Sequence, residues 1–131
     1  MMRTLRVFVP AVLLASLTCC SSQPMLTSPE QIVFPDSAVS YRNHVQPFLA
    51  LTCAFSACHG DVNPAGGVRL TTYFTLFTDR ANLVVPAAPD ESLVIQVLDR
   101  RIPHSLDVMR PVNSNHIAGM RRWILEGALN N

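Results

Sequence analysis

The apolar residues of the chain recur at the spacing of helices. In residues 40–49, four of them fall on one helical face: Tyr41, Val45, Phe48 and Leu49. Pro47 lies inside this segment and cannot donate a helical hydrogen bond, so we expect two short turns rather than one long helix. A final helix is predicted from Ser114 onward, with Gly127 as its stop. Its apolar face comprises Ile117, Met120, Trp123 and Ile124.

Two shorter segments complete the predicted secondary structure. Residues 70–77 are rich in threonine and aromatic residues, which by composition alone favours a strand. Because no second strand is available to pair with them, we expect a short helix instead. Asp90, Glu91 and Ser92 place acidic groups at the start of another helix, which continues through the apolar residues of 93–98. The pattern as a whole predicts an all-α fold.

The N-terminal 19 residues have the features of a secretory signal peptide. Two arginines precede an apolar run over residues 7–17, which is shorter than the ~20 residues that a membrane-spanning helix needs. The sequence LTCC at residues 17–20 resembles the bacterial lipoprotein box, and this resemblance implies that Cys20 is lipidated. The alternative is a plain signal peptide followed by two spare thiols.

Removal of this signal changes the size and charge of the chain. The 131 residues include ten arginines, no lysine and nine acidic residues. A mature chain that begins at Cys20 has lost Arg3 and Arg6, and its 112 residues carry a net charge of −1. Without a basic cluster it lacks the surface on which nucleic-acid-binding proteins hold phosphates. Residues 20–37 are rich in polar residues and proline and predict a flexible tether, so we expect the globular domain over residues 38–131.

Cys53 and Cys58 are the cysteines that remain, and His59 follows the second of them. Covalent haem attachment uses two thiols and an adjacent histidine that ligates the iron, normally spaced C-x-x-C-H. Here four residues separate the cysteines, so the loop would have to bulge away from the ring to deliver both sulfurs. A disulfide between the two cysteines is one alternative, although its short loop would stabilise the fold little. A zinc site that adds His44 or His104 to the three residues is another.

The sequence around this motif resembles the cytochrome c domains of planctomycete-type bacterial membrane proteins. Residues 45–48 are similar to the family's entry to the haem motif, and residues 53–59 are similar to its C-x4-C-H variant. The similarity continues through three further segments: GVRL at 67–70, VPAAP at 85–89 and WILEGA at 123–128. It implies a small helical domain wrapped around one covalent haem c, with Cys53, Cys58 and His59 holding the cofactor. The aromatic rings of residues 70–77 would then pack toward the haem.

The same resemblance assigns the second axial position of the iron to Met109. A neutral thioether favours ferrous iron and therefore raises the reduction potential. His104 is the alternative ligand, and it would lower the potential. His44 and His116 are expected at the surface or in supporting positions. Three arginines are candidates either for contacts with the haem propionates or for a solvated face: Arg69, Arg100 and Arg101.

These features together predict a lipid-anchored monohaem cytochrome c. It would be an electron carrier rather than an enzyme, passing single electrons between redox protein partners such as a membrane respiratory or photosynthetic complex. It would be exported and would face the periplasm or the exterior of a bacterial membrane, where the tether raises the local concentration for partner binding. A haem peroxidase or small-molecule sensor with a displaceable sixth ligand is the first alternative. A haem-free lipoprotein cross-linked by Cys53 and Cys58 is the second.

Overall fold

The computed structural model describes residues 25–104 and 111–131, and every regular element in these two ranges is helical. The α-helices are α1 (Gln46–Thr52), α2 (Thr75–Thr78), α3 (Leu93–Leu98) and α5 (Ser114–Leu125). The single turns are the 3₁₀ turns η1 (Pro29–Gln31), η3 (Ala65–Gly67) and η4 (Pro89–Glu91) and the π-helical turn η2 (Tyr41–Val45). Since the described ranges contain no strand, the predicted helical fold class is confirmed there.

Three features predicted from the sequence lie outside these ranges: the signal peptide, the lipidated Cys20 and the distal Met109. None of the helices in residues 25–104 and 111–131 combines the length and apolar character that crossing a membrane requires.

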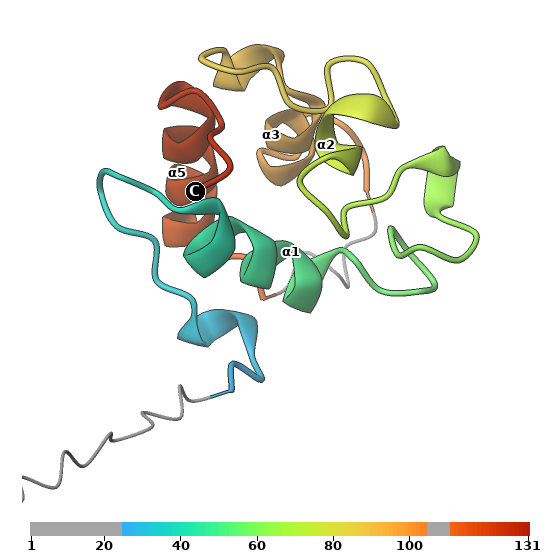
Figure 1. Ribbon diagram of the computed structural model, residues 1–131, viewed down its shortest axis with the longest axis horizontal. Coiled ribbons are helices and arrows are strands. Elements are labelled where there is room, and N and C mark those ends of the chain that lie inside the picture. The colour runs from blue at the N-terminus through green and yellow to red at the C-terminus, as the bar shows by residue number, and fades with distance from the viewer. Residues whose placement is uncertain (1–24, 105–110) are drawn as a thin grey trace, which may run out of the picture.

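The C-terminus of the chain is bonded to the start of the helical segment that comprises η2 and α1. In Figure 1, α1 runs below α5 and α3, and the C-terminus lies beside the beginning of α1. The carbonyl of Asn131 accepts hydrogen bonds from the Arg42 amide at 3.0 Å and from the Ser40 hydroxyl at 2.9 Å. The side chain of Asn131 also accepts from the Tyr41 amide at 2.8 Å. These bonds fix the entry to the helical segment that leads to the cysteines.

Pro47 divides that segment as predicted. The turn η2 precedes it, and the Gln46 amide closes a π-helical turn by donating to the Tyr41 carbonyl. Proline then falls in the first turn of α1, where its missing N–H costs no intrahelical bond. The four predicted apolar residues, Tyr41, Val45, Phe48 and Leu49, are all buried.

The core is built around α5, which begins at Ser114 as predicted. Asn113 caps it by accepting a hydrogen bond from the His116 amide at 3.0 Å. Met120, Trp123 and Ile124 on its inner face are fully buried. The helix stops at the predicted place, because Gly127 takes a φ of 100° that only glycine adopts without strain.

The packed domain begins earlier than the sequence predicted. Ile32 and Phe34, both within the expected tether of residues 20–37, are buried in the core. The Phe34 amide donates to the Asn115 side chain at 2.9 Å, and the Asn115 amide group donates back to the Phe34 carbonyl at 3.0 Å. A Cβ on Gly119 would meet the Phe34 ring at 2.1 Å, so glycine makes the groove that holds this ring against α5. The packed core therefore includes residues from Ile32 onward, which precede the boundary expected at residue 38.

His116 is not at the surface, the first of the two positions expected for it. Its side chain is fully buried, and Nε2 lies 3.1 Å from the Ile32 carbonyl. Since a carbonyl can only accept, Nε2 carries the hydrogen, while Nδ1 accepts from the Asn113 amide at 3.2 Å. His116 thus ties the N-terminal segment to α5. His44 is half-buried and accepts at Nδ1 from the Ser40 amide at 3.0 Å, in keeping with a supporting role.

Candidate functional site

An apolar cavity of about 330 Å³ lies among α1, α3 and the loop that follows the cysteines. Its apolar lining comes mainly from these parts of the chain: Phe48, Leu49, Val68, Leu70, Leu83, Leu93, Val94, Val97, Leu98 and Ile102. The side chains in the lining that carry chemistry are Cys53, His59, Arg80 and His104. The structure therefore brings three of the residues predicted for haem binding, Cys53, His59 and His104, to one apolar cavity.

The loop that carries the motif is shaped by its own backbone. Helix α1 ends at Thr52, and the carbonyl of Cys53 accepts from the His59 amide at 3.1 Å, which closes the loop. Inside it, the Phe55 carbonyl accepts from the amides of Cys58 at 2.9 Å and Gly60 at 2.8 Å. A Cβ on Gly60 would come within 2.8 Å of that same carbonyl oxygen, so this close turn requires glycine. The intervening Phe55, Ser56 and Ala57 are exposed, as the bulge predicted for a four-residue spacer requires.

The two cysteines differ in their surroundings. Cys53 lines the cavity, and burial raises the pKa of its thiol, which therefore stays protonated at neutral pH. Cys58 is half-buried, five residues further along the loop. Both are free thiols, so the cross-link of the disulfide alternative is not formed. Within residues 25–104 and 111–131 no three metal-ligating side chains converge, and the zinc alternative has no ligand set there.

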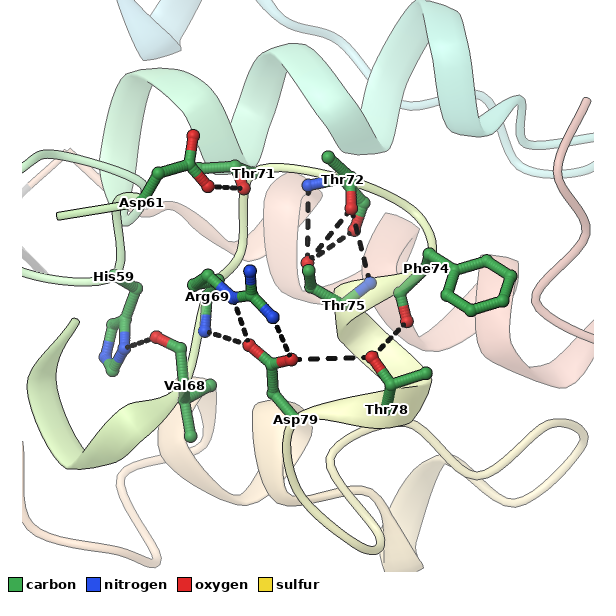
Figure 2. Close-up of polar contacts among 10 residues, drawn as sticks. All are labelled: His59, Asp61, Val68, Arg69, Thr71, Thr72, Phe74, Thr75, Thr78 and Asp79. Carbon is green, nitrogen blue, oxygen red and sulfur yellow. Dashed lines mark hydrogen bonds and ion pairs between the residues drawn. The ribbon is translucent and has the colours of Figure 1, made fainter. Parts of the chain in front are cut away.

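Three hydrogen bonds hold His59, two through its backbone and one through Nδ1, and they leave Nε2 available to bind a metal. Its amide donates to Cys53, its carbonyl accepts from the Leu70 amide at 2.9 Å, and its Nδ1 lies 2.9 Å from the Val68 carbonyl. Figure 2 shows this last bond. Because a carbonyl only accepts, Nδ1 is the protonated nitrogen and Nε2 keeps its lone pair. This is the tautomer that a metal-ligating histidine needs, and the partner on Nδ1 fixes the ring orientation.

His104 lies close to His59. The two ring centroids are 5.8 Å apart and the ring planes differ by 12°. Both rings belong to the cavity lining, so the alternative distal ligand named from the sequence does reach the site. Met109 falls in residues 105–110, outside the described ranges.

None of the three arginines named as candidates for the haem propionates lines the cavity, and all three are exposed, as the alternative of a solvated face predicts. Arg69 forms a bidentate pair with Asp79, with Nη2 2.8 Å from Oδ1 and Nε 2.8 Å from Oδ2. Arg101 pairs with Asp90 and Asp99, and Arg100 is exposed outside the cavity lining. The arginine in the lining is instead Arg80, which the sequence analysis missed. Asp79, the residue before Arg80 in the sequence, is bound by Arg69 instead. No carboxylate in the described ranges pairs with Arg80.

The aromatic residues of the segment 70–77 also depart from expectation. Helix α2 covers only Thr75–Thr78, and none of the rings of this segment belongs to the cavity lining. Tyr73 packs edge-on against Tyr41 with centroids 5.2 Å apart, and its hydroxyl donates to the Ala128 carbonyl at 2.9 Å. Phe74 is 74% exposed. The aliphatic residues on either side of α2, Leu70 and Leu83, line the cavity in their place.

The Arg69–Asp79 pair predicts an acid-sensitive contribution to stability. The hydrogen bond from Arg69 is the main cause that lowers the pKa of Asp79 from 3.8 to about 2. The folded state therefore gains from the ionised carboxylate above the unfolded pKa, and loses that gain as the pH falls from 3.8 toward 2. Urea unfolding at a series of pH values should show a steeper loss of stability in this window for the unsubstituted chain than for Asp79→Asn. Parallel curves for the two chains would contradict this assignment.

A histidine whose Nδ1 donates to a backbone carbonyl, and a cysteine that lines the same apolar cavity, are features of a c-type haem site. The donor set and the lining thus fit a haem. Residues 56–106 match the family model described as Planctomycete cytochrome C, so the chain contains a planctomycete-type cytochrome c domain. The match includes Cys58, His59 and His104, whereas Cys53 and Met109 lie outside it. No curated protein and no solved structure matches the chain.

Proposed function

We propose that the chain is a membrane-tethered monohaem cytochrome c that passes single electrons between redox protein partners. The observation that carries the proposal is the state of His59, whose Nδ1 is committed to Val68 while Nε2 is left free. The family match supports a haem-based carrier, and the proposal adds the number of haems, the ligands and the tether.

The residues proposed to hold the cofactor have separate parts, and of these Cys53, His59 and Arg80 line the cavity. Cys53 and Cys58 would supply the sulfurs for the two thioether bonds, and His59 and Met109 would ligate the iron. The haem iron supplies a one-electron change of oxidation state when both axial positions are filled. The aliphatic lining excludes water, which disfavours the more charged ferric site and helps to keep the potential high. Arg80, the arginine of the lining, is placed to hold a propionate.

The N-terminal segment connects this domain to a membrane. Cys20 carries the lipid, and the polar residues between it and the buried Ile32 form the tether. Such a tether keeps the domain near partners in the same membrane, where a redox complex of a respiratory or photosynthetic chain is the expected class. The lack of lysine fits this arrangement, since long-range attraction by a basic surface is not required.

The distal ligand is tested by two substitutions in the haem-loaded protein. Met109→Ala should lower the reduction potential sharply and abolish the methionine–iron absorption band, because a neutral sulfur ligand is lost. His104→Ala should leave both unchanged. The reverse pattern would make His104 the ligand. His104 is the histidine to test, because its ring centroid lies 5.8 Å from that of His59. Met120→Leu is the matched control, because Met120 is fully buried in α5 and does not line the cavity.

The same preparation separates a carrier from an enzyme or sensor. A six-coordinate carrier binds neither carbon monoxide nor peroxide in its resting state, because both axial positions are occupied. Rapid binding of either molecule by the unsubstituted protein would favour the haem peroxidase or sensor alternative.

A further inference from the structure

One peptide group connects Asp79 to His59. The Val68 carbonyl accepts from Nδ1 of His59 at 2.9 Å, and the amide of the following residue, Arg69, donates to Oδ2 of Asp79 at 2.9 Å. These two groups belong to the same peptide bond, and the described residues contain no cis peptide. In a planar trans peptide the C=O and N–H point in opposite directions. The carboxylate and the imidazole therefore lie at opposite ends of one rigid unit, as Figure 2 shows.

Asp79 holds this peptide firmly. Besides the Arg69 amide it binds Nε and Nη2 of the same arginine, both at 2.8 Å, so three hydrogen bonds join the two residues. The Asp79 side chain is only 6% exposed, which shields these bonds from water. Its backbone is fixed to the end of α2, where its amide donates to the Thr75 carbonyl at 3.3 Å. The anchor for the His59 ring is therefore the end of α2, where Asp79 lies ten residues beyond Arg69 and 20 residues beyond His59.

We propose that Asp79 is a positioning residue for His59, which it orients and makes more basic through the Val68–Arg69 peptide. The inference rests on the proposed role of His59 as a haem ligand. A carboxylate that accepts from a peptide N–H polarises the peptide and makes its carbonyl a stronger acceptor. A stronger acceptor on Nδ1 raises the basicity of the ligating imidazole, and a more basic ligand favours ferric iron. Asp79 should thus lower the reduction potential without touching the cofactor.

Substitutions at Asp79 test this in the haem-loaded full-length protein. Asp79→Asn keeps an acceptor but removes the charge, and Asp79→Ala removes both. We expect the reduction potential to rise in the order unsubstituted, Asn, Ala, and the ¹⁵N resonance of His59 Nδ1 to move in the same order toward a weaker hydrogen bond. Asp90→Asn is the matched control: it removes a carboxylate that accepts from Arg121 at 2.9 Å but has no bond to the Val68–Arg69 peptide. Both readouts should stay at the unsubstituted value in this control.

Arg69→Gln separates the peptide from the ion pair. It removes the guanidinium but leaves the backbone N–H that reaches Asp79, so we expect a smaller shift of the His59 resonance than Asp79→Ala gives. An Arg69→Gln shift as large as that of Asp79→Ala would overturn the inference. So would equal shifts of potential in Asp79→Asn and Asp90→Asn, since a general charge effect would then suffice. If the mature chain carries no haem, the proposed function fails by itself, and the His59 resonance of haem-free variants still decides between these outcomes.

Discussion

Replacing both cysteines of the motif, by Cys53→Ser and Cys58→Ser together, should yield a chain that carries no covalently bound haem. Each thioether needs a sulfur nucleophile, and serine at these positions cannot form the bond. The fold should survive, because neither thiol forms a disulfide and neither cysteine is among the buried residues of the core. The measurement is a pyridine haemochrome spectrum of protein made in a host that matures c-type cytochromes, after extraction of non-covalent haem with acidified solvent.

The single substitutions make the same prediction sharper. Cys53→Ser and Cys58→Ser alone should each keep one thioether and shift the haemochrome band toward that of a haem with one free vinyl group. His59→Ala serves as a comparison that leaves both sulfurs in place but removes the ligand held by Val68. Covalent haem in the double variant would contradict the assignment of the attachment site.

The largest loss of stability is expected from Trp123→Ala. Trp123 is fully buried on α5, packs against Tyr41 with ring centroids 5.8 Å apart, and donates from Nε1 to the Leu129 carbonyl at 3.0 Å. Removing a fully buried indole costs about 3–5 kcal/mol, which is a large share of the about 5–15 kcal/mol that holds a typical domain together. Urea or thermal unfolding followed by far-ultraviolet circular dichroism measures the change.

Two further variants separate packing from a general effect on the helix. Leu125→Ala lies two residues away on the same helix but is 52% exposed, and it should change the free energy of unfolding by less than about 1 kcal/mol. Trp123→Phe keeps most of the volume and loses the bond to Leu129, so its cost should fall between the other two. A Trp123→Ala cost no larger than that of Leu125→Ala would show that α5 is not the centre of the core.

The helical elements could be predicted because each depends on residues close together in sequence. The apolar faces of residues 41–49 and of the last helix follow the helical repeat, and both are buried as that repeat indicates. The linear spacing of Cys53, Cys58 and His59 likewise indicates haem chemistry before any fold is known. The family match to residues 56–106 confirms the domain type read from these motifs.

The rest of the site depends on contacts that sequence spacing does not encode. The acceptor that fixes His59 is the carbonyl of Val68, and a backbone group gives no side-chain signal. The guanidinium of Arg69 is paired with Asp79, ten residues later, and the sequence alone does not distinguish this partner from a haem propionate. Ile32 lies in a segment rich in polar residues and proline, and the histidine that binds its carbonyl is 84 residues away in the sequence.

The mass of the mature protein, isolated from a host that matures c-type cytochromes, tests the central claim most directly. The account predicts a chain heavier by one haem, with Cys53 and Cys58 both resistant to alkylation after denaturation and reduction, and with a lipid on the peptide that begins at Cys20. A chain without haem, in which both of these cysteines react with the alkylating reagent, would contradict it.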